Sequence, residues 1–431
     1  MDETVEQRRG ALPAAFVATV ALTASLAAVF FLIRQRGLDP DSIDPYSYGK
    51  IARGFLEHGF DKLTRHAAML YPHLLAVIYW LGGTDFVAIL INCLFHVGTC
   101  LSVFALGRRL FNARTGLIAG IACALHPMLL RYVPDLHTEA LLALLSTLTV
   151  WCAVLFDERP TVGRGILLGT VGMISTLAKG VMLPFLLIFG GLAILRSRRS
   201  APGVPGSLRG ALAMFAAIAV VLAPWTYRNY RVTGGSFVLL TPGAADAFLR
   251  GYVFTRLEFA TLKKPPYTDA ENEVNAWFRS IARESGTVWG EDEVVDEKNN
   301  QRVAKRMILE HPFDTGRKVM VGAFTFWYEM TSLQNSLVPG VLALVSWILA
   351  FFGLRRARDE GRRAWLLWLP IVVMNLLVAA LIPLGRYSVP VLPCLTLLAA
   401  FGAEMFLAPR QANQRSLARQ LPPGAAVGNR S

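Results

Sequence analysis

The chain has 431 residues, of which 54% are hydrophobic and only 17% are charged, and its formal net charge is +13. In soluble domains about a quarter of all residues are usually charged, so this composition excludes an ordinary soluble protein. The positive charge lies in short loops between apolar runs, as in the positive-inside pattern of membrane proteins. No nucleic-acid-binding motif accompanies it. We therefore predict an all-α fold, a polytopic transmembrane helix bundle of about ten spans.

The predicted spans are apolar runs close to the roughly 20 residues that cross a bilayer. The first, residues 12–33, is not followed by a small-residue cleavage site, so we interpret it as a retained anchor. Residues 69–81 are too few to span and are expected at the membrane interface. Residues 166–195 are long enough for two short spans hinged near Lys179 and Gly180. The other candidates are residues 86–106, 116–130, 138–156, 211–225, 337–353, 365–382 and 389–407.

The cysteines all lie inside these apolar runs and show no C-x-x-C pair or metal-ligand spacing. We expect them to pack as small apolar residues. They are Cys93, Cys100, Cys123, Cys152 and Cys394.

Short arginine-rich loops give the predicted topology. Residues 108–114, 159–164, 196–209 and 355–363 are expected in the cytoplasm, together with both termini. The predicted organisation is then a cytoplasmic N-terminus (1–11), an N-terminal transmembrane catalytic module (12–225) with a first outer loop (34–69), an outer region (226–318), C-terminal transmembrane helices (319–408) and a cytoplasmic tail (409–431). The tail is rich in Gln, Arg, Pro and Gly and is expected to be disordered.

The first outer loop carries three carboxylates, Asp39, Asp41 and Asp44, just beyond the first span. Asp44 followed by Pro45 would suit the start of the next helix, with Asp at the N-cap and Pro at the first position. The functional interpretation is a carboxylate at the membrane surface that takes a proton from a hydroxyl. The residue pattern leaves both interpretations open.

Cations from five separate segments reach the same outer face in this topology. Interfacial anchoring explains any one of them, but as a set they depart from the charge bias of short outer loops. Such a ring would suit a phosphate held at the level of the lipid headgroups. The residues are Arg65 with His66 and Tyr71, Arg131 near Glu139, Lys179, Arg228, and Arg386 with Tyr387.

Several different short motifs follow one another along the chain, and their order is characteristic. They are residues 44–48 leading into Ile51-Ala52, Leu70-Tyr71-Pro72, residues 106–111, residues 126–132, Thr138-Glu139, residues 224–230 with Gly234-Gly235, and residues 385–393. In this order the sequence resembles the integral-membrane GT-C glycosyltransferases, in particular the dolichyl-phosphate-mannose protein mannosyltransferases and the bacterial transferases that add aminoarabinose to lipid A. The likeness covers about the first 250 residues and the last 50.

The resemblance implies an inverting transfer of a sugar from a polyprenyl phosphate on the outer face of the membrane. It implies that Asp44, by its distance from Tyr48, is the general base. The cationic ring would then bind the donor phosphate, and Asp41, Tyr48, Arg131 and Glu139 would be acceptor-side or secondary residues. The chain departs from the family pattern at residues 67–69, where relatives often place Pro, and in lacking a large C-terminal outer domain. Both departures concern the acceptor more than the chemistry.

We therefore expect an undecaprenyl-phosphate sugar as donor and a hydroxyl of a glycan, lipid or protein as acceptor, at a bacterial inner membrane with the site facing the periplasm. The first loop has carboxylates enough for a divalent metal but no fixed ligand spacing, so no metal site is predicted. The alternative is a transporter or flippase of a lipid-linked envelope precursor. Transporters place ionisable residues near the bilayer midplane and often show inverted repeats, and neither pattern is seen here. A third interpretation is a non-catalytic scaffold.

Overall fold

The computed structural model describes residues 2–36, 48–59, 70–199, 205–241, 243–256, 266–330 and 333–407. Within these ranges the chain forms seventeen α-helices and two short 3-10 helices, and no β-strand. The predicted all-α fold is confirmed. The cysteines are all free and buried, as expected of small apolar residues. The tail predicted to be disordered lies outside the described residues.

Among the described residues, six helical stretches are long and apolar enough to cross a membrane, which makes the chain a multi-pass membrane protein. The helices that supply them are α1 (Asp2–Arg36), α5 (Asp85–Leu110), α8 (Thr138–Glu158), α10 (Leu183–Arg199), α11 (Pro205–Val232) and α17 (Leu333–Asp359). Shorter apolar helices lie among them: α4 (Leu70–Trp80), α6 (Ala113–Ala124), α9 (Val162–Ala178), α18 (Trp365–Ala380) and α19 (Leu392–Leu407). The predicted count of about ten spans is not confirmed.

The run from 166 to 195 divides at the predicted hinge. Helix α9 ends at Ala178, Lys179 is extended (φ −164°, ψ 125°), and the 3-10 helix η1 (Gly180–Met182) leads into α10. Lys179 thus lies between the two helices, and its amine contacts Glu139 of α8.

The run from 116 to 130 is broken, which the sequence analysis did not predict. Helix α6 ends at Ala124, and α7 (Pro127–Leu130) begins after a break of two residues. Nδ1 of His126 accepts a hydrogen bond from the backbone N–H of Met128, and Pro127 occupies the first helical position, where its missing N–H costs nothing. A new helix therefore starts where apolar composition alone suggested a continuous one.

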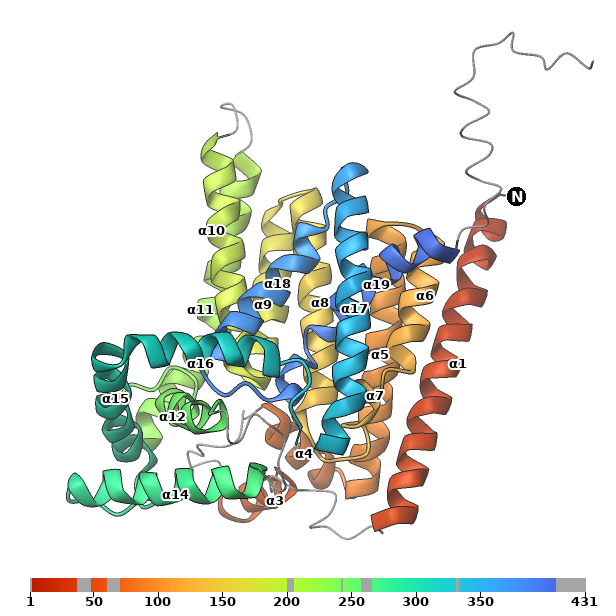
Figure 1. Ribbon diagram of the computed structural model, residues 1–431. Helices are drawn as coiled ribbons and strands as arrows, with labels where there is room; N and C mark the ends of the chain where they lie inside the picture. Colours follow the sequence, from red (N-terminus) through yellow and green to blue (C-terminus); the bar gives the residue numbers. More distant parts are fainter. Residues whose placement is uncertain are drawn as a thin grey trace, which may run out of the picture.

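In the described part of the polar region after α11, four helices pack around a small core of their own. They are α12 (Ala244–Phe254), α14 (Pro266–Glu284), α15 (Glu293–Glu310) and α16 (Pro312–Thr325). In Figure 1 they lie beside one end of the long helices, with α14 and α16 running across the direction of the bundle. Glu297 helps to join them, because its carboxylate accepts a hydrogen bond of 2.9 Å from the backbone N–H of Ala245 at the start of α12.

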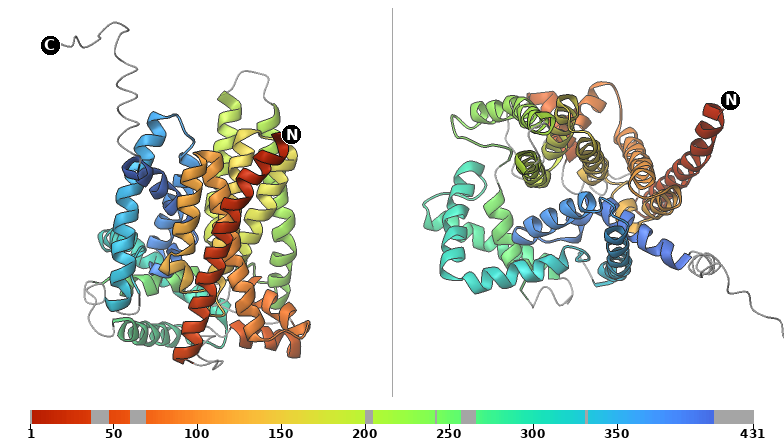
Figure 2. Two further views of the ribbon diagram at one scale, coloured as in Figure 1. Left: turned by 90° about the vertical axis from the view of Figure 1, so that its right-hand side faces the viewer. Right: turned by 90° about the horizontal axis from the view of Figure 1, so that it is seen from above.

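The two ends of the bundle differ in charge and in the helices that form them. The start of α1, the end of α19 and the turn from α17 to α18 share one end (Figures 1 and 2). The opposite end holds α3 (Tyr48–His58), α4, α7 and the helices of the polar region. This arrangement gathers the turns that carry Arg108, Arg159 and Arg362 on one side, as the predicted topology requires.

Candidate functional site

A buried carboxylate lies at the centre of the candidate site. Glu139 stands in the first turn of α8, and its side chain is almost fully buried. Its Oε1 accepts a hydrogen bond of 2.9 Å from Nζ of Lys179, and its Oε2 contacts Nδ1 of His137. A buried carboxylate is costly unless it is paired and hydrogen-bonded. The hinge after α9 supplies that partner by turning Lys179 toward α8.

The 3-10 helix η2 (Gly385–Ser388) brings a second cation and a tyrosine to the same place. Nζ of Lys179 lies 4.0 Å from the centre of the Tyr387 ring, and Nη2 of Arg386 donates a 2.8 Å hydrogen bond to the Tyr387 hydroxyl. Burial acts to raise the pKa of Tyr387, but the positive charges of Arg386 and Lys179 outweigh it and lower that pKa. Tyr387 is thus held between two cations.

Aromatic side chains enclose His137 on the other side. The Tyr48 and Tyr132 rings lie 5.9 and 5.4 Å from the imidazole, centre to centre. Tyr71 packs edge-on against Tyr48 at 5.7 Å, and its hydroxyl exchanges hydrogen bonds with the side chain of Asn92. The helices α3, α4, α5 and α8 therefore meet at this wall of the site.

The segment that carries Arg386 is fixed by a close backbone contact. The N–H of Gly385 donates a 2.7 Å hydrogen bond to the backbone carbonyl of Glu329, and a Cβ on Gly385 would lie 2.8 Å from that oxygen. No larger residue fits at position 385 without movement. This backbone contact fixes the segment that carries Arg386 against the residues just after α16.

An apolar groove begins beside this contact. It has a volume of about 510 Å³ and lies between α16, α17 and α18. Phe324 and Leu344 on its rim are largely exposed, so it opens toward the side of the bundle. Its lining residues are Ala323, Phe324, Trp327, Tyr328, Gly340, Ala343, Leu344, Trp347 and Asn375. The backbone of Tyr328 also lies beside Gly385, the residue before Arg386, so the groove adjoins the segment that carries Arg386.

Several of the predicted site residues meet in this cluster: Lys179, Arg386 and Tyr387 of the ring, and Glu139 and Tyr48 of the secondary residues, with Tyr71 behind them. Two others lie in different surroundings. Arg131 is partly exposed, 3.9 Å from Asp135, and Arg228 lies over the Trp225 ring at 5.2 Å and contacts Asn229. Asp41, Asp44, Arg65 and His66, which include the predicted base, lie outside the described residues.

The end of α11 that carries Arg228 is nonetheless joined to the Lys179 turn. Nδ2 of Asn229 donates a 2.7 Å hydrogen bond to the carbonyl of Leu240. The Leu240 side chain in turn lies within 3.2 Å of the position that a Cβ on Gly180 would take. Leu240 thus links the residue after Arg228 to the residue after Lys179.

The sequence analysis missed His137, Asn92 and Glu329. His137 was detectable, since it stands two residues before Glu139 and just before a predicted helix. Asn92 sits in the middle of an apolar run, where only the fold reveals its hydrogen bonds to Tyr71 and to the Asp135 carbonyl. Within the described part of the chain, no group of three or more His, Cys, Asp or Glu side chains could hold a metal ion.

Part of the chain matches a known protein family. A family model described as dolichyl-phosphate-mannose-protein mannosyltransferase matches residues 66–225. That stretch contains His137, Glu139 and Lys179, whereas Arg386 lies beyond it. No curated protein sequence matches the chain significantly.

Solved structures share the fold. The archaeal oligosaccharyltransferase AglB from Archaeoglobus fulgidus, in complex with an inhibitory peptide and a dolichol-phosphate, is 14% identical with a TM-score of 0.54, and the match covers 97% of this chain and 52% of that one. The same enzyme in complex with Zn and sulfate gives 14% identity, a TM-score of 0.53, and coverage of 94% and 52%. This chain thus spans about half the length of these archaeal structures.

A third structure, ArnT from Cupriavidus metallidurans bound to undecaprenyl phosphate, is 16% identical over 94% of this chain and 81% of that chain. Its TM-score is 0.33, so the argument from fold rests on the archaeal structures. The motifs, the match to residues 66–225 and the shared fold together confirm the predicted resemblance: the chain is similar to the GT-C integral-membrane glycosyltransferases.

Proposed function

We propose that the protein is an inverting glycosyltransferase that moves a sugar from a polyprenyl-phosphate carrier to an acceptor hydroxyl at the outer end of the bundle. One observation carries the proposal: Lys179 and Arg386 converge on a buried cluster that adjoins an apolar groove. A ligand with an anionic head and a long hydrocarbon tail has the chemistry that this pair of neighbouring features recognises.

The donor phosphate is proposed to bind beside Arg386 and Lys179. Lys179 and Arg386 both contact Tyr387, so two basic side chains stand side by side where an incoming anion would bind. An arginine fork matches phosphate geometry in a bidentate manner. Glu139 would then be a positioning residue that holds Lys179 and His137, rather than the base, because both of its oxygens are already engaged.

The polyprenyl tail would lie in the groove between α16, α17 and α18. Its aromatic walls, Trp327, Tyr328 and Trp347, are the kind of surface on which an isoprenoid chain packs, and its open rim would let the chain enter from the bilayer. An undecaprenyl carrier in a bacterial plasma membrane remains the expected donor, with the acceptor a hydroxyl of a glycan, lipid or protein.

Asp44 is proposed as the general base. It precedes Tyr48 by four residues, and Tyr48 packs against His137 in the cluster. Four residues of extended chain span up to about 14 Å, which is enough to reach the donor site. Asp44 would take the proton of the acceptor hydroxyl, whose oxygen attacks the anomeric carbon. The bond to the phosphate oxygen breaks, and the phosphate leaves with the electron pair, stabilised by Arg386 and Lys179.

The position of the cluster favours transfer over transport. Glu139 lies in the first turn of α8, and Lys179 directly follows the last residue of α9. Transporters place such residues near the bilayer midplane, whereas these stand at helix ends, where a water-borne acceptor can arrive.

Purified protein in proteoliposomes, given a radiolabelled polyprenyl-phosphate sugar and an envelope extract as acceptor source, tests the proposal. We expect label to move to an acceptor and unlabelled polyprenyl phosphate to accumulate. Movement of intact donor across the bilayer without sugar transfer would instead establish the flippase. Absence of both activities would support the scaffold.

A further inference from the structure

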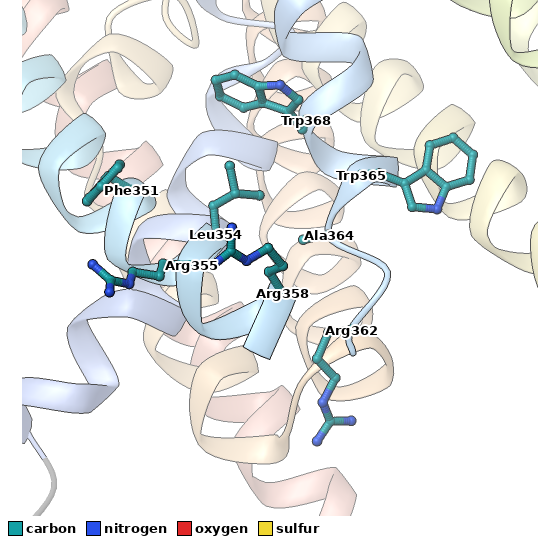
Figure 3. Close-up of a pocket in the computed structure, with 8 residues that line it drawn as sticks. All are labelled: Phe351, Leu354, Arg355, Arg358, Arg362, Ala364, Trp365 and Trp368. Atoms are coloured by element: carbon teal, nitrogen blue, oxygen red, sulfur yellow. The ribbon is translucent and has the colours of Figure 1, made fainter. Parts of the chain in front are cut away.

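A second groove lies at the end of the bundle opposite the candidate active site. It has a volume of about 570 Å³ and lies where α17 turns into α18 (Figure 3). One part of its wall is apolar, and three arginines stand around it. The lining residues are Phe351, Leu354, Arg355, Arg358, Arg362, Ala364, Trp365 and Trp368.

The groove continues an apolar stripe along the outer face of α17. Leu344, Ile348 and Phe351 follow one another at intervals of four and three residues, and all three are largely exposed. Residues spaced in this way share one face of a helix. The next two positions of the same stripe are Arg355 and Arg358, so the face that contacts lipid changes from apolar to basic at the end of the helix.

The arginines that line the groove are weakly compensated by carboxylates. Within the described residues Arg355 has no ion-pair partner. Arg358 contacts only Asp359 at 3.7 Å, with both side chains mostly exposed. Arg362 lies 3.3 Å from Glu360. The groove therefore presents excess positive charge.

Neighbouring arginines that do not line the groove are paired closely. Arg363 and Arg196 share Asp157 at 2.9 and 3.1 Å. Arg356 binds Glu360 at 2.7 Å and Glu404 at 3.0 Å. Close pairing with carboxylates therefore distinguishes these arginines from the three that line the groove.

We infer that this groove binds an anionic glycerophospholipid, with the phosphate among Arg355, Arg358 and Arg362. Figure 3 places the guanidinium of Arg358 in the middle of the group, with those of Arg355 and Arg362 at opposite edges. Guanidinium groups match phosphate oxygens in geometry as well as charge. An acyl chain would continue along the stripe from Phe351, and tryptophans such as Trp365 and Trp368 are typical of headgroup depth.

The phosphate position at Arg358 is distinct from the proposed donor phosphate position at Arg386, since the two lie at opposite ends of the bundle, and it does not depend on transferase activity. The acyl chain would run along the stripe toward Leu344, which also lies on the rim of the groove proposed for the donor tail. A phospholipid bound here would stabilise the α17–α18 turn. Because α17 and α18 also wall the groove proposed for the donor tail, the lipid would support that groove from its other end.

Native mass spectrometry of the full chain in detergent provides the test. Wild-type protein is titrated with dioleoyl phosphatidylglycerol and with dioleoyl phosphatidylcholine. The groove variant is R355Q/R358Q/R362Q. The matched control is R108Q/R159Q/R209Q, which removes three exposed arginines from the same end of the bundle.

We expect wild type to prefer phosphatidylglycerol, the groove variant to lose on the order of 100-fold in its affinity for that lipid, and the control to change by less than about threefold. Equal losses in both variants would overturn the proposal, since bulk charge would then explain binding. Tight binding of undecaprenyl phosphate or inorganic phosphate, without binding of phosphatidylglycerol, would also overturn it. An unchanged thermal unfolding curve for the groove variant shows that any loss reflects the site.

Discussion

Lys179 and Glu139, 40 residues apart in the chain, meet at 2.9 Å inside the bundle. The contact exists because α9 stops one residue before Lys179, which is then extended instead of helical. A continuous helix through this position would have carried the amine elsewhere. The same side chain lies against Tyr387, so one hinge joins α8, α9 and η2.

Glu139→Gln should destabilise the protein by about 3 kcal/mol, because removing one partner of a buried pair leaves the other charge uncompensated. Thermal unfolding in detergent measures the loss. Glu158→Gln, at the other end of α8 and paired with Arg109 near the surface, should cost less than about 1 kcal/mol. Equal losses of stability in the two variants would show that the Glu139–Lys179 pair stabilises the protein no more than the surface pair does.

Arg386→Lys should raise the KM for the polyprenyl-phosphate donor, with a loss of about tenfold in kcat/KM, since an ammonium cannot reproduce a bidentate phosphate contact. Steady-state kinetics with varied donor test this. Arg231→Lys, an exposed arginine in the last turn of α11, is the control and should behave as wild type. Unaltered donor kinetics in Arg386→Lys would remove this residue from the phosphate site.

Gly385→Ala should weaken donor use although it adds only a methyl group. That Cβ would lie 2.8 Å from the Glu329 carbonyl, so η2 and Arg386 must shift. Gly316→Ala in α16, where nothing lies within 4 Å of the added Cβ, should be neutral or stabilise by up to about 1 kcal/mol. If donor kinetics respond alike in both, the backbone contact at Gly385 does not position Arg386.

Much of this arrangement could be predicted from the sequence, and the exceptions have physical reasons. Apolar run lengths predicted most helices, and the polar pair Lys179-Gly180 inside one run predicted its hinge. The break at His126 depends on a side-chain cap and a proline, which hydropathy does not register. The helices between 244 and 325 pack on a small core of their own. Their composition is mostly polar, so a search for apolar runs did not predict them.

The site was only partly predictable for similar reasons. The spans predicted that Lys179 and Arg386 share a membrane face, but not that they meet at Tyr387. Arg228 was expected in the same ring because it lies at the same membrane face. The depth of a residue in the membrane, however, does not determine which helices are neighbours. Glu139 was expected to have a secondary role, and its burial between Lys179 and His137 emerges only from packing.

Cysteine labelling should establish the orientation of the bundle. In a variant lacking the native cysteines, a membrane-impermeant maleimide added from outside should label Glu291→Cys, in the polar region, and should miss Arg159→Cys, in a basic turn. The reason is that short arginine-rich loops stay in the cytoplasm. Labelling of Arg159→Cys in intact cells would invert the topology and place the cluster on the wrong face.

The rate of sugar transfer by Asp44→Asn tests the central claim most directly. Asn caps a helix about as well as Asp but cannot accept the proton, so thermal stability should be unchanged while transfer falls about 10²- to 10⁴-fold. Asp41→Asn, measured in the same assay, should keep most of its activity. Near-normal transfer by Asp44→Asn, or an equal loss in Asp41→Asn, would contradict the assignment of Asp44 as the base.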